Sequence, residues 1–235
     1  MAALDEVAQA PRLSVVIPVL DDAEALTALL RALDPASHPA LEVIVVDASS
    51  GGRISEIVGE AGARWIPAPR GRGHQLRMGS GEARGRWLWF LHADTQRVEP
   101  ALRYLLSLSR AASPAWGRFD VAFDVATPLL RVVAAAMNAR SRLSGICTGD
   151  QGMFLHRDLL SAVGGVPAQS LMEDVELSAR LRRLRRPRSR RETLVTSARR
   201  WRAHGPLRTV LRMWWFRLRY WLGADPERLA REYYR

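Results

Sequence analysis

The chain has 235 residues, 48% of them apolar, and a formal net charge of +11 that comes entirely from arginine, because no lysine occurs. This length suits one domain with a hydrophobic core, and the composition excludes global disorder. No apolar run reaches the about 18 residues of a membrane-spanning helix, the start lacks an apolar signal sequence, and the lone Cys147 excludes an internal disulfide. We therefore expect a cytoplasmic protein, soluble or peripheral at the inner face of the cell membrane, with anionic partners.

Strand and helix patterns alternate through the first half of the chain. Short β-branched or apolar runs predict strands at residues 13–19, 41–46, 63–67 and 87–91. Helical periodicity is found at residues 23–32, 54–61, 75–83 and 101–110. The acidic pair Asp21-Asp22 stands before the first of these helices, where it can supply the N-cap. The alternation indicates βαβ units and a mostly parallel sheet.

The second half of the chain repeats these patterns less regularly. Strands are predicted at 118–125 and 152–156, and helices at 129–143, at 173–185 and in a short segment that ends at Val163. The arginine run at 180–191, interrupted by Pro187, is typical of a solvated helix end followed by a loop. Residues 1–11 are expected to be a flexible N-terminus, residues 12–200 a single α/β domain and residues 201–235 an amphipathic helical arm.

Two aspartates directly follow predicted strands. Asp47 follows the strand at 41–46. Asp94 is the last residue of the His92-Ala93-Asp94 corner, which follows the strand at 87–91. Right-handed crossovers bring the carboxyl ends of parallel strands to one edge, where open α/β sheets bind ligands. We therefore expect both aspartates in one crevice, and the carboxylate oxygens of Asp94 suit Mg²⁺ or Mn²⁺ beside a phosphate. The alternative for Asp94 is a turn residue or a helix N-cap.

Three segments, taken in order, resemble a known family. They are the strand at 13–19, the His92-Ala93-Asp94 corner, and Gly164-Gly165 followed by Met172-Glu173-Asp174. Together they resemble the family 2 inverting glycosyltransferases of the GT-A fold, over roughly residues 13–185. The resemblance implies a Rossmann-like sheet flanked by helices, and sugar transfer from a nucleotide-diphosphate donor of UDP or GDP type. The family's metal motif is Asp-x-Asp, and the His-Ala-Asp corner here resembles a short bacterial branch.

The resemblance also implies roles for single residues. Asp94 falls on the metal-binding position, for Mg²⁺ or Mn²⁺, while His92 replaces the first carboxylate of the motif. His204 is a second candidate ligand, because some GT-A enzymes use a C-terminal histidine. Asp174 matches the general base, with Glu173 beside it, and repulsion between paired carboxylates raises one pKa towards a useful value. The alternative is that the pair complements the dipole of a helix first turn.

The nucleotide is expected to contact strand ends and one basic turn. The strand-end residues are Pro18, Val19, Asp22, Asp47 and Ala93. Arg70, Arg72 and Gly73 form the turn, whose guanidinium and backbone N–H groups can bind a diphosphate; a solvated loop is the alternative. Asp150 and Gln151 precede a predicted strand and match the family's donor and acceptor side, and a glycine-flanked turn is their alternative.

The C-terminal arm has two apolar faces. A seam recurs at spacings of three and four residues, and it consists of Leu207, Leu211, Trp214, Leu218 and Trp221. Met213, Phe216 and Tyr220 form a second face. One face can pack on the domain, and the other then needs a partner, for which a membrane interface and a homodimer are the candidates. The alternatives are a helix buried all round, or cover by Trp201 and Tyr233-Tyr234.

The predicted function is metal-dependent, inverting transfer of a sugar to an acceptor hydroxyl or carboxyl, and the aromatic arm favours a lipid-like acceptor. A sugar-phosphate nucleotidyltransferase uses a similar sheet and metal, but it usually has a glycine-rich loop with a lysine where this chain has Pro18-Val19-Leu20-Asp21-Asp22. A basic, non-enzymatic adaptor for membranes or nucleic acid is the other alternative. We expect no nucleic-acid binding, because the arginine run at 180–191 lacks interleaved aromatic residues.

Overall fold

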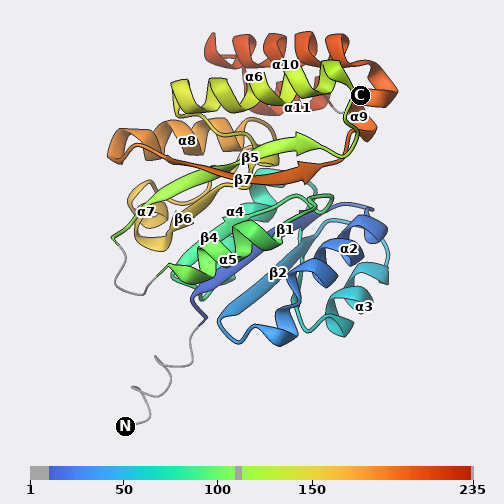
Figure 1. Cartoon of the computed structure of the whole chain (residues 1–235), viewed down its shortest axis with the longest axis vertical. Coiled ribbons are helices and arrows are strands. Elements are labelled where there is room, and N and C mark those ends of the chain that lie inside the picture. The colour runs from blue at the N-terminus through green and yellow to red at the C-terminus, as the bar shows by residue number, and fades with distance from the viewer. Residues whose placement is uncertain (1–10, 109–112, 234–235) are drawn as a thin grey trace.

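The computed structural model describes residues 11–108 and 113–233 (Figure 1). The side chains of residues 200, 204 and 207 also lie outside the described part. Several predictions therefore fall outside it: nearly all of the flexible N-terminus, the end of the helix at 101–110, and the side chains of His204, Leu207 and Tyr234. Within the described part, no helix is both long and apolar enough to cross a lipid bilayer.

A single sheet of seven strands organises the described chain, in the order β3-β2-β1-β4-β6-β5-β7. Its parallel half consists of β1 Leu13–Val19, β2 Leu41–Asp47, β3 Arg64–Pro67 and β4 Trp87–Phe90. In the other half, β6 Phe154–His156 runs antiparallel to β4 and to β5 Trp116–Phe123, and β7 Arg188–Thr196 runs parallel to β5. The prediction of a mostly parallel α/β sheet is confirmed.

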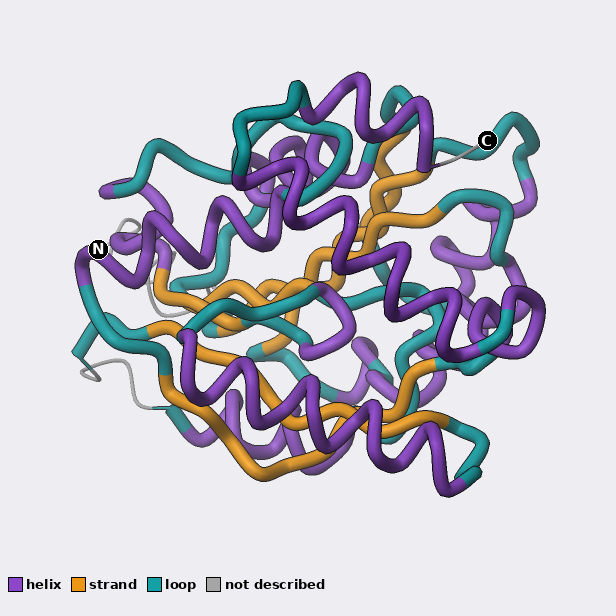
Figure 2. The backbone as a smooth tube through the Cα atoms, turned by 90° about the horizontal axis from the view of Figure 1, so that it is seen from above, coloured by secondary structure: helices purple, strands orange, loops and turns teal. Residues whose placement is uncertain are grey.

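Helices cover both faces of this sheet, as Figure 2 shows. The face that packs Leu13, Val15 and Ile17 is covered by α2 Ala23–Leu33, α3 Arg53–Glu60 and α5 Glu99–Ser107. The opposite face is covered by α4 Arg72–Glu82, α7 Arg157–Ala162 and α8 Glu173–Leu184. Strands β1 and β2 are buried along their whole length because both faces are covered, which explains their continuous apolar runs.

The remaining helices gather at the end of the molecule beyond β5 and β7 (Figure 1). They are α6 Pro128–Ser144, α9 Arg199–His204, α10 Pro206–Trp221 and α11 Pro226–Tyr233, and two 3₁₀ turns, η1 Pro35–Ser37 and η2 Gly149–Gln151, occur elsewhere. A separate small core joins them to the sheet, where Trp201 packs on Phe123 with ring centroids 5.0 Å apart. The C-terminal arm therefore packs against the domain.

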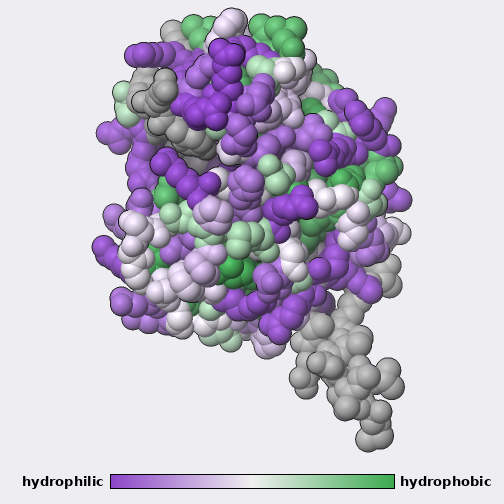
Figure 3. Space-filling view, turned by 180° about the vertical axis from the view of Figure 1, so that it is seen from behind, coloured by the Kyte–Doolittle hydropathy of each residue, from purple (hydrophilic) through white to green (hydrophobic). Residues whose placement is uncertain are grey.

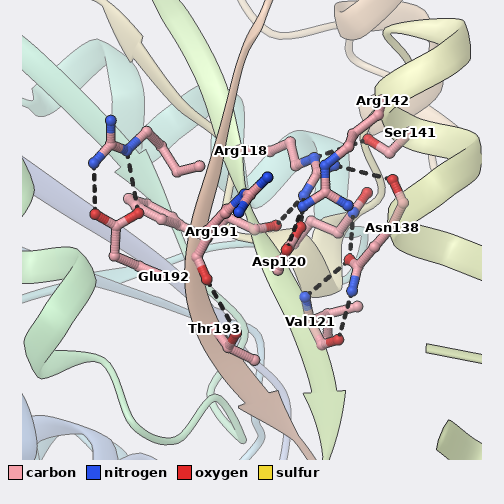
Figure 4. Close-up of polar contacts among 12 residues, drawn as sticks. Arg118, Asp120, Val121, Asn138, Ser141, Arg142, Arg191, Glu192 and Thr193 are labelled. Atoms are coloured by element: carbon pink, nitrogen blue, oxygen red, sulfur yellow. Dashed lines mark hydrogen bonds and ion pairs between the residues drawn. The ribbon is translucent and has the colours of Figure 1, made fainter. Parts of the chain in front are cut away.

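A buried polar network fastens α6 to β5 (Figure 4). Arg118 of β5 is fully buried, and its guanidinium donates to Oγ of Ser141 at 3.1 Å and to the carbonyl oxygen of Asn138 at 3.0 Å. It also pairs with Asp120. The side chain of Asn138 bonds the backbone N–H and C=O of Val121, both at 3.0 Å. A buried guanidinium without hydrogen-bond partners would raise the free energy of the folded state. Because Ser141 and Asn138 of α6 supply these partners, the network fixes α6 relative to the sheet.

Strand β7 is not predicted from the sequence. Residues 180–191 resemble a helix end and a loop, but α8 ends at Leu184 and residues 188–191 already belong to β7. The reason is the position of β7 at the edge of the sheet. The first half of the strand is solvated there, so it can consist of charged side chains and needs no apolar ones. Edge strands of this kind lack the apolar alternation by which strands are recognised.

Two local predictions near the carboxyl edge of the sheet are also wrong. Helix α4 begins at Arg72, so Arg72 lies in the first helical turn, because Gly71 with its positive φ of 141° turns the chain sharply into the helix. Asp22 stands at the N-cap position of α2 but makes no capping hydrogen bond. Its backbone, with φ −119° and ψ 58°, departs from capping geometry, and its carboxylate pairs with Arg199 instead.

Candidate active site

A cavity of about 520 Å³ lies at the carboxyl edge of the parallel strands. One side, here called the strand-edge wall, is built from loops after strands and from first turns of helices. Its residues are Pro18, Val19, Asp22, Arg70, Arg72, Gln75, His92, Ala93, Asp94, Asp150, Glu173 and Asp174. The other side, called the arm wall, is built from the segment after β7 and from α9, α10 and α11. Its residues are Ser197, Arg199, Trp201, Thr209, Met213, Phe216, Arg217 and Tyr233.

Asp94 lies in the turn that follows β4. The N–H of Thr95 donates to the carbonyl oxygen of His92 at 3.1 Å and closes this turn. The next helix, α5, has Val98 as its N-cap residue, so Asp94 does not cap it. The buried strand thus ends by presenting one half-buried carboxylate to the cavity.

The electrostatics around Asp94 favour a cation. Burial raises the pKa of Asp94, and the negative charges of Asp150 and Asp22 raise it further against the opposing charge of Arg199. Nε2 of His92 lies 3.8 Å from a carboxylate oxygen of Asp150. Carboxylates that repel one another in this way would be stabilised by a bound positive charge.

The described side chains alone do not complete a metal site, and a bound nucleotide would have to supply further oxygen ligands. No three His, Cys, Asp or Glu side chains among them form a metal-binding group. Mg²⁺ at nucleotide sites is commonly held by one or two carboxylates, with phosphate oxygens and water completing the shell. Asp94 fits that arrangement for Mg²⁺ or Mn²⁺. The backbone of His204 ends α9, and its side chain lies outside the described part.

The predicted acidic pair lies at the start of α8 and lines the cavity. Met172 before it has a left-handed backbone with φ 64°, and the pair does occupy a helix first turn, as the alternative interpretation requires. Glu173 is 3% exposed and forms an ion pair with Arg72. Asp174 accepts the N–H of Gly149 at 2.7 Å and lies 3.7 Å from Nη1 of Arg72.

The two carboxyl groups differ in exposure and environment. Burial raises the pKa of Glu173 to about 7 against the lowering influence of Arg72, and the charge of Asp174 adds to the rise. The side chain of Asp174 is 16% exposed, compared with 4% for Glu173. Asp174 is therefore better placed to meet a ligand in the cavity, and Glu173 is better placed to hold Arg72.

Helix α4 is tied closely to the structure around the cavity. A Cβ on Gly73 would overlap the carbonyl oxygen of Gln169 and lie 2.8 Å from that of Pro167, so only glycine fits here. Nε2 of Gln75 donates to the carbonyl oxygens of Val19 at 2.9 Å and Val46 at 2.7 Å. These contacts join the start of α4 to the ends of β1 and β2.

Among the predicted site residues whose side chains the structure describes, three do not line the cavity: Asp47, Gly73 and Gln151. The carboxylate of Asp47 accepts the N–H of Ser49 at 2.8 Å and the indole N–H of Trp65 at 3.1 Å. Gln151 is fully buried and bonds Asn138 at 3.3 Å, which connects η2 to the network around α6. Both residues hold backbone segments that carry the lining residues.

None of the residues that line the arm wall is predicted from the sequence as a site residue; in the arm, the sequence names only His204 as a candidate ligand. Arg199 pairs with Asp22 and so joins the two walls. Phe216 is 5% exposed and packs edge-to-face on Tyr233, with ring centroids 5.4 Å apart. The spacing of Met213, Phe216 and Tyr220 indicates an apolar face, but it contains no information about the surface that this face covers.

The fold and cavity define a class of protein, an open and mostly parallel α/β sheet that presents carboxylates and arginines to a ligand at its carboxyl edge. The chain belongs to glycosyl transferase family 2, whose model matches residues 14–162. The match ends before α8, so the acidic pair and the arm lie outside it. A comparison with curated proteins finds no match.

Solved glycosyltransferases confirm the GT-A fold. A mannosyltransferase from Pyrobaculum calidifontis, solved with GDP-Man and Mn²⁺, is 19% identical with a TM-score of 0.56, over 79% of this chain and 56% of that chain. Glucosyl-3-phosphoglycerate synthase from Mycobacterium tuberculosis, solved with Mn²⁺, UDP and glucosyl-3-phosphoglycerate, is 18% identical with a TM-score of 0.55, over 80% and 71%. TarS from S. aureus is 15% identical with a TM-score of 0.58, over 79% and 36%. The chain thus spans about half of the first of these proteins and about a third of the last.

Proposed function

We propose that the chain is a metal-dependent, inverting glycosyltransferase that moves a sugar from a nucleotide-diphosphate donor to an acceptor hydroxyl or carboxyl. One observation carries the proposal: Asp94 and Asp174, from segments far apart in the sequence, line the same cavity at the carboxyl edge of the sheet, where open α/β sheets bind ligands. The His92-Ala93-Asp94 corner supports assignment to the short bacterial branch of the family.

The donor would be held on the strand-edge wall. Pro18, Val19 and Ala93 supply backbone and apolar surface for the nucleoside, and Arg70 and Arg72 supply positive charge for the diphosphate. A Mg²⁺ or Mn²⁺ ion held by Asp94 would neutralise the charge that develops on the leaving diphosphate. Structural neighbours solved with Mn²⁺ and a nucleotide support this assignment.

Asp174 would act as the general base. Its carboxylate, oriented by the N–H of Gly149, takes the proton from the acceptor hydroxyl. The acceptor oxygen then bonds to the anomeric carbon as the bond to the diphosphate oxygen breaks, and one such displacement inverts that carbon. Glu173 keeps Arg72 in place beside the diphosphate. An acceptor carboxylate, already ionised, would need no base.

The acceptor would enter along the arm wall. Met213 and Phe216 offer apolar surface there, and Arg217 offers positive charge. Arg140 does not line the cavity, but its charge interacts with that of Arg217: burial and the charge of Arg217 lower the pKa of Arg140 to about 10, against the influence of Asp174. Nη2 of Arg140 is buried without a hydrogen-bond partner among the described residues. An acceptor with both an apolar part and an anionic group suits the lining residues Met213, Phe216 and Arg217.

Calorimetric titration of UDP, GDP and dTDP, with and without Mn²⁺, on the wild type and on Asp94→Ala tests the donor site. We expect one nucleotide to bind tightly, and its affinity to fall on the order of tenfold to a hundredfold when Mn²⁺ is withheld or Asp94 is replaced. Ser49→Ala is the matched control, because Ser49 lies near the strand ends but outside the cavity lining. Absence of binding to every nucleotide would reject the proposal and leave a basic adaptor as the better hypothesis.

A further inference from the structure

The outer face of α10 carries large apolar side chains that stay exposed in the described structure. Their exposed fractions are 67% for Leu211, 65% for Trp214, 57% for Trp215, 48% for Leu218, 72% for Trp221 and 78% for Leu222, which follows the helix. These six residues are called the apolar strip. Figure 3 shows hydrophobic side chains at the top of the molecule, where Figure 1 places α10. Apart from Leu207, whose side chain lies outside the described part, the predicted seam of the arm therefore faces outwards.

The strip cannot turn inwards, because the opposite face of α10 is already occupied. Thr209 is 6% exposed and Phe216 is 5% exposed. Val210 and Met213 pack on the small core that contains Trp201. Rotation of the helix would expose these side chains and open the cavity that they help to enclose. The exposed strip is thus a property of this fold, and its large apolar side chains form one group along the helix instead of being scattered singly over the surface.

The surroundings of the strip are positively charged. Residues 199–221 contain seven arginines and no acidic residue. Arg208 is exposed and lies one turn before Leu211. Arg212 and Arg219 follow on the same ridge and are held by α11, Arg212 through the carbonyl oxygen of Tyr233 at 2.8 Å and Arg219 through Glu232. Tryptophan beside arginine is the composition that favours the headgroup region of an anionic bilayer.

Charge also decides between the candidate partners. Two copies that met strip to strip would bring two arginine-rich segments together, and the like charges would oppose the contact. An anionic lipid surface has the opposite charge and an apolar interior within reach of tryptophan side chains. The combination of an apolar strip with a segment, residues 199–221, that contains seven arginines and no acidic residue therefore matches lipid better than a second copy, although Glu232 of α11 pairs with Arg219.

We propose that α10 docks this chain on an anionic membrane surface, with the apolar strip in the headgroup region and Arg208 against lipid phosphates. The other side of the same helix presents Met213, Phe216 and Arg217 to the cavity. Since a helix with side chains is about 10 Å across, docking brings the cavity close to the lipid surface. Presentation of a membrane-held acceptor follows from this geometry and rests on the proposed function, whereas docking itself does not.

Co-sedimentation of the full chain with vesicles tests the docking surface. Vesicles of phosphatidylcholine with phosphatidylglycerol are compared with phosphatidylcholine alone. We expect binding to be stronger by about tenfold on the anionic vesicles, and to fall by about tenfold or more in Trp214→Ser/Trp221→Ser. Leu184→Ser, at a 52% exposed position on α8, is the matched control and should bind as the wild type does. Arg208→Gln should weaken binding to anionic vesicles only.

Three outcomes would overturn the proposal. They are absence of vesicle binding by the wild type, equal binding by the tryptophan variant, and a wild-type dimer that the tryptophan variant converts to monomer without any change in vesicle binding. Circular dichroism and thermal melting establish that each variant is folded, and Leu218→Ser serves if the double variant is not. Calorimetric nucleotide binding should be unchanged in the strip variants, which separates failure of docking from failure of the donor site.

Discussion

The two walls of the cavity are built in different ways. The strand-edge wall stands on strands that are buried along their length, and its central ion pair, Arg72 with Glu173, is 19% and 4% exposed. The arm wall is joined to it by Arg199 and Asp22, which are 65% and 26% exposed. The ion pair within the first wall is therefore far more buried than the pair that joins the two walls, and this difference suits the donor and acceptor roles that we propose for them. Substitutions in the two walls should accordingly have different effects.

Asp174→Asn should give the largest effect on activity. The variant keeps the hydrogen bond from Gly149 but cannot accept a proton, so kcat for the donor identified by calorimetry should fall on the order of a thousandfold with unchanged nucleotide affinity. Glu176→Gln is the control, because Glu176 is another acidic residue in the first turn of α8. Equal losses in both variants would mean that these acids act only on the helix dipole.

Arg72→Met should give the largest loss of stability. The substitution leaves Glu173 buried without its counter-ion, which should lower the free energy of unfolding by about 4 kcal/mol in urea denaturation at a pH above 7, where this carboxyl is charged. Adding Glu173→Gln should restore much of the loss. Arg64→Met is the comparison, because Glu42 keeps bonds from Ser14 and Arg84 when Arg64 is removed, and its cost should be clearly smaller. Similar costs would contradict the special position of the strand-edge ion pair.

The next largest effect should be a pH dependence of stability that reports the raised pKa of Glu173. Burial raises its pKa from 4.5 to about 7, so the folded state binds the proton more tightly than the unfolded state does. The contribution of Glu173 to the free energy of unfolding should therefore fall as pH rises from 4.5 to about 7 and stay low above, a change of about 3 kcal/mol. Denaturation across this range should show that slope in the wild type and its loss in Glu173→Gln; parallel curves would contradict the raised pKa.

Arg199→Gln should have the smallest effect. The pair with Asp22 is largely exposed, so its loss should change the free energy of unfolding by less than about 1 kcal/mol and weaken further in salt. Removing this charge also leaves the repulsion between Asp94 and its acidic neighbours less compensated. The affinity for the anionic nucleotide without metal should therefore fall by a few-fold. Arg202→Gln, an exposed arginine on the same helix, should have neither effect. A loss of stability like that of Arg72→Met would show that both walls are equally rigid.

Much of the parallel sheet follows from local patterns in the sequence. The strands at 13–19 and 87–91 are predicted within one residue, because central strands covered on both faces need apolar side chains at every position. The edge strand β7 is missed for the opposite reason, since its solvated half needs none. The positions of Asp94 and Asp174 are likewise marked in the sequence by family motifs, and their roles stay predictions.

The arm shows what only the tertiary structure decided. Periodicity predicts two apolar faces on α10, one through Trp214 and Leu218 and one through Met213 and Phe216. Both are apolar enough to be buried, and the free energy of burial depends on the surface that a helix meets as well as on the helix itself. The small core beside β5 and the rings of Trp201 and Tyr233 select the second face. Closure of the cavity and exposure of the tryptophans both follow from which face of α10 is buried. No local pattern in the sequence determines which face that is.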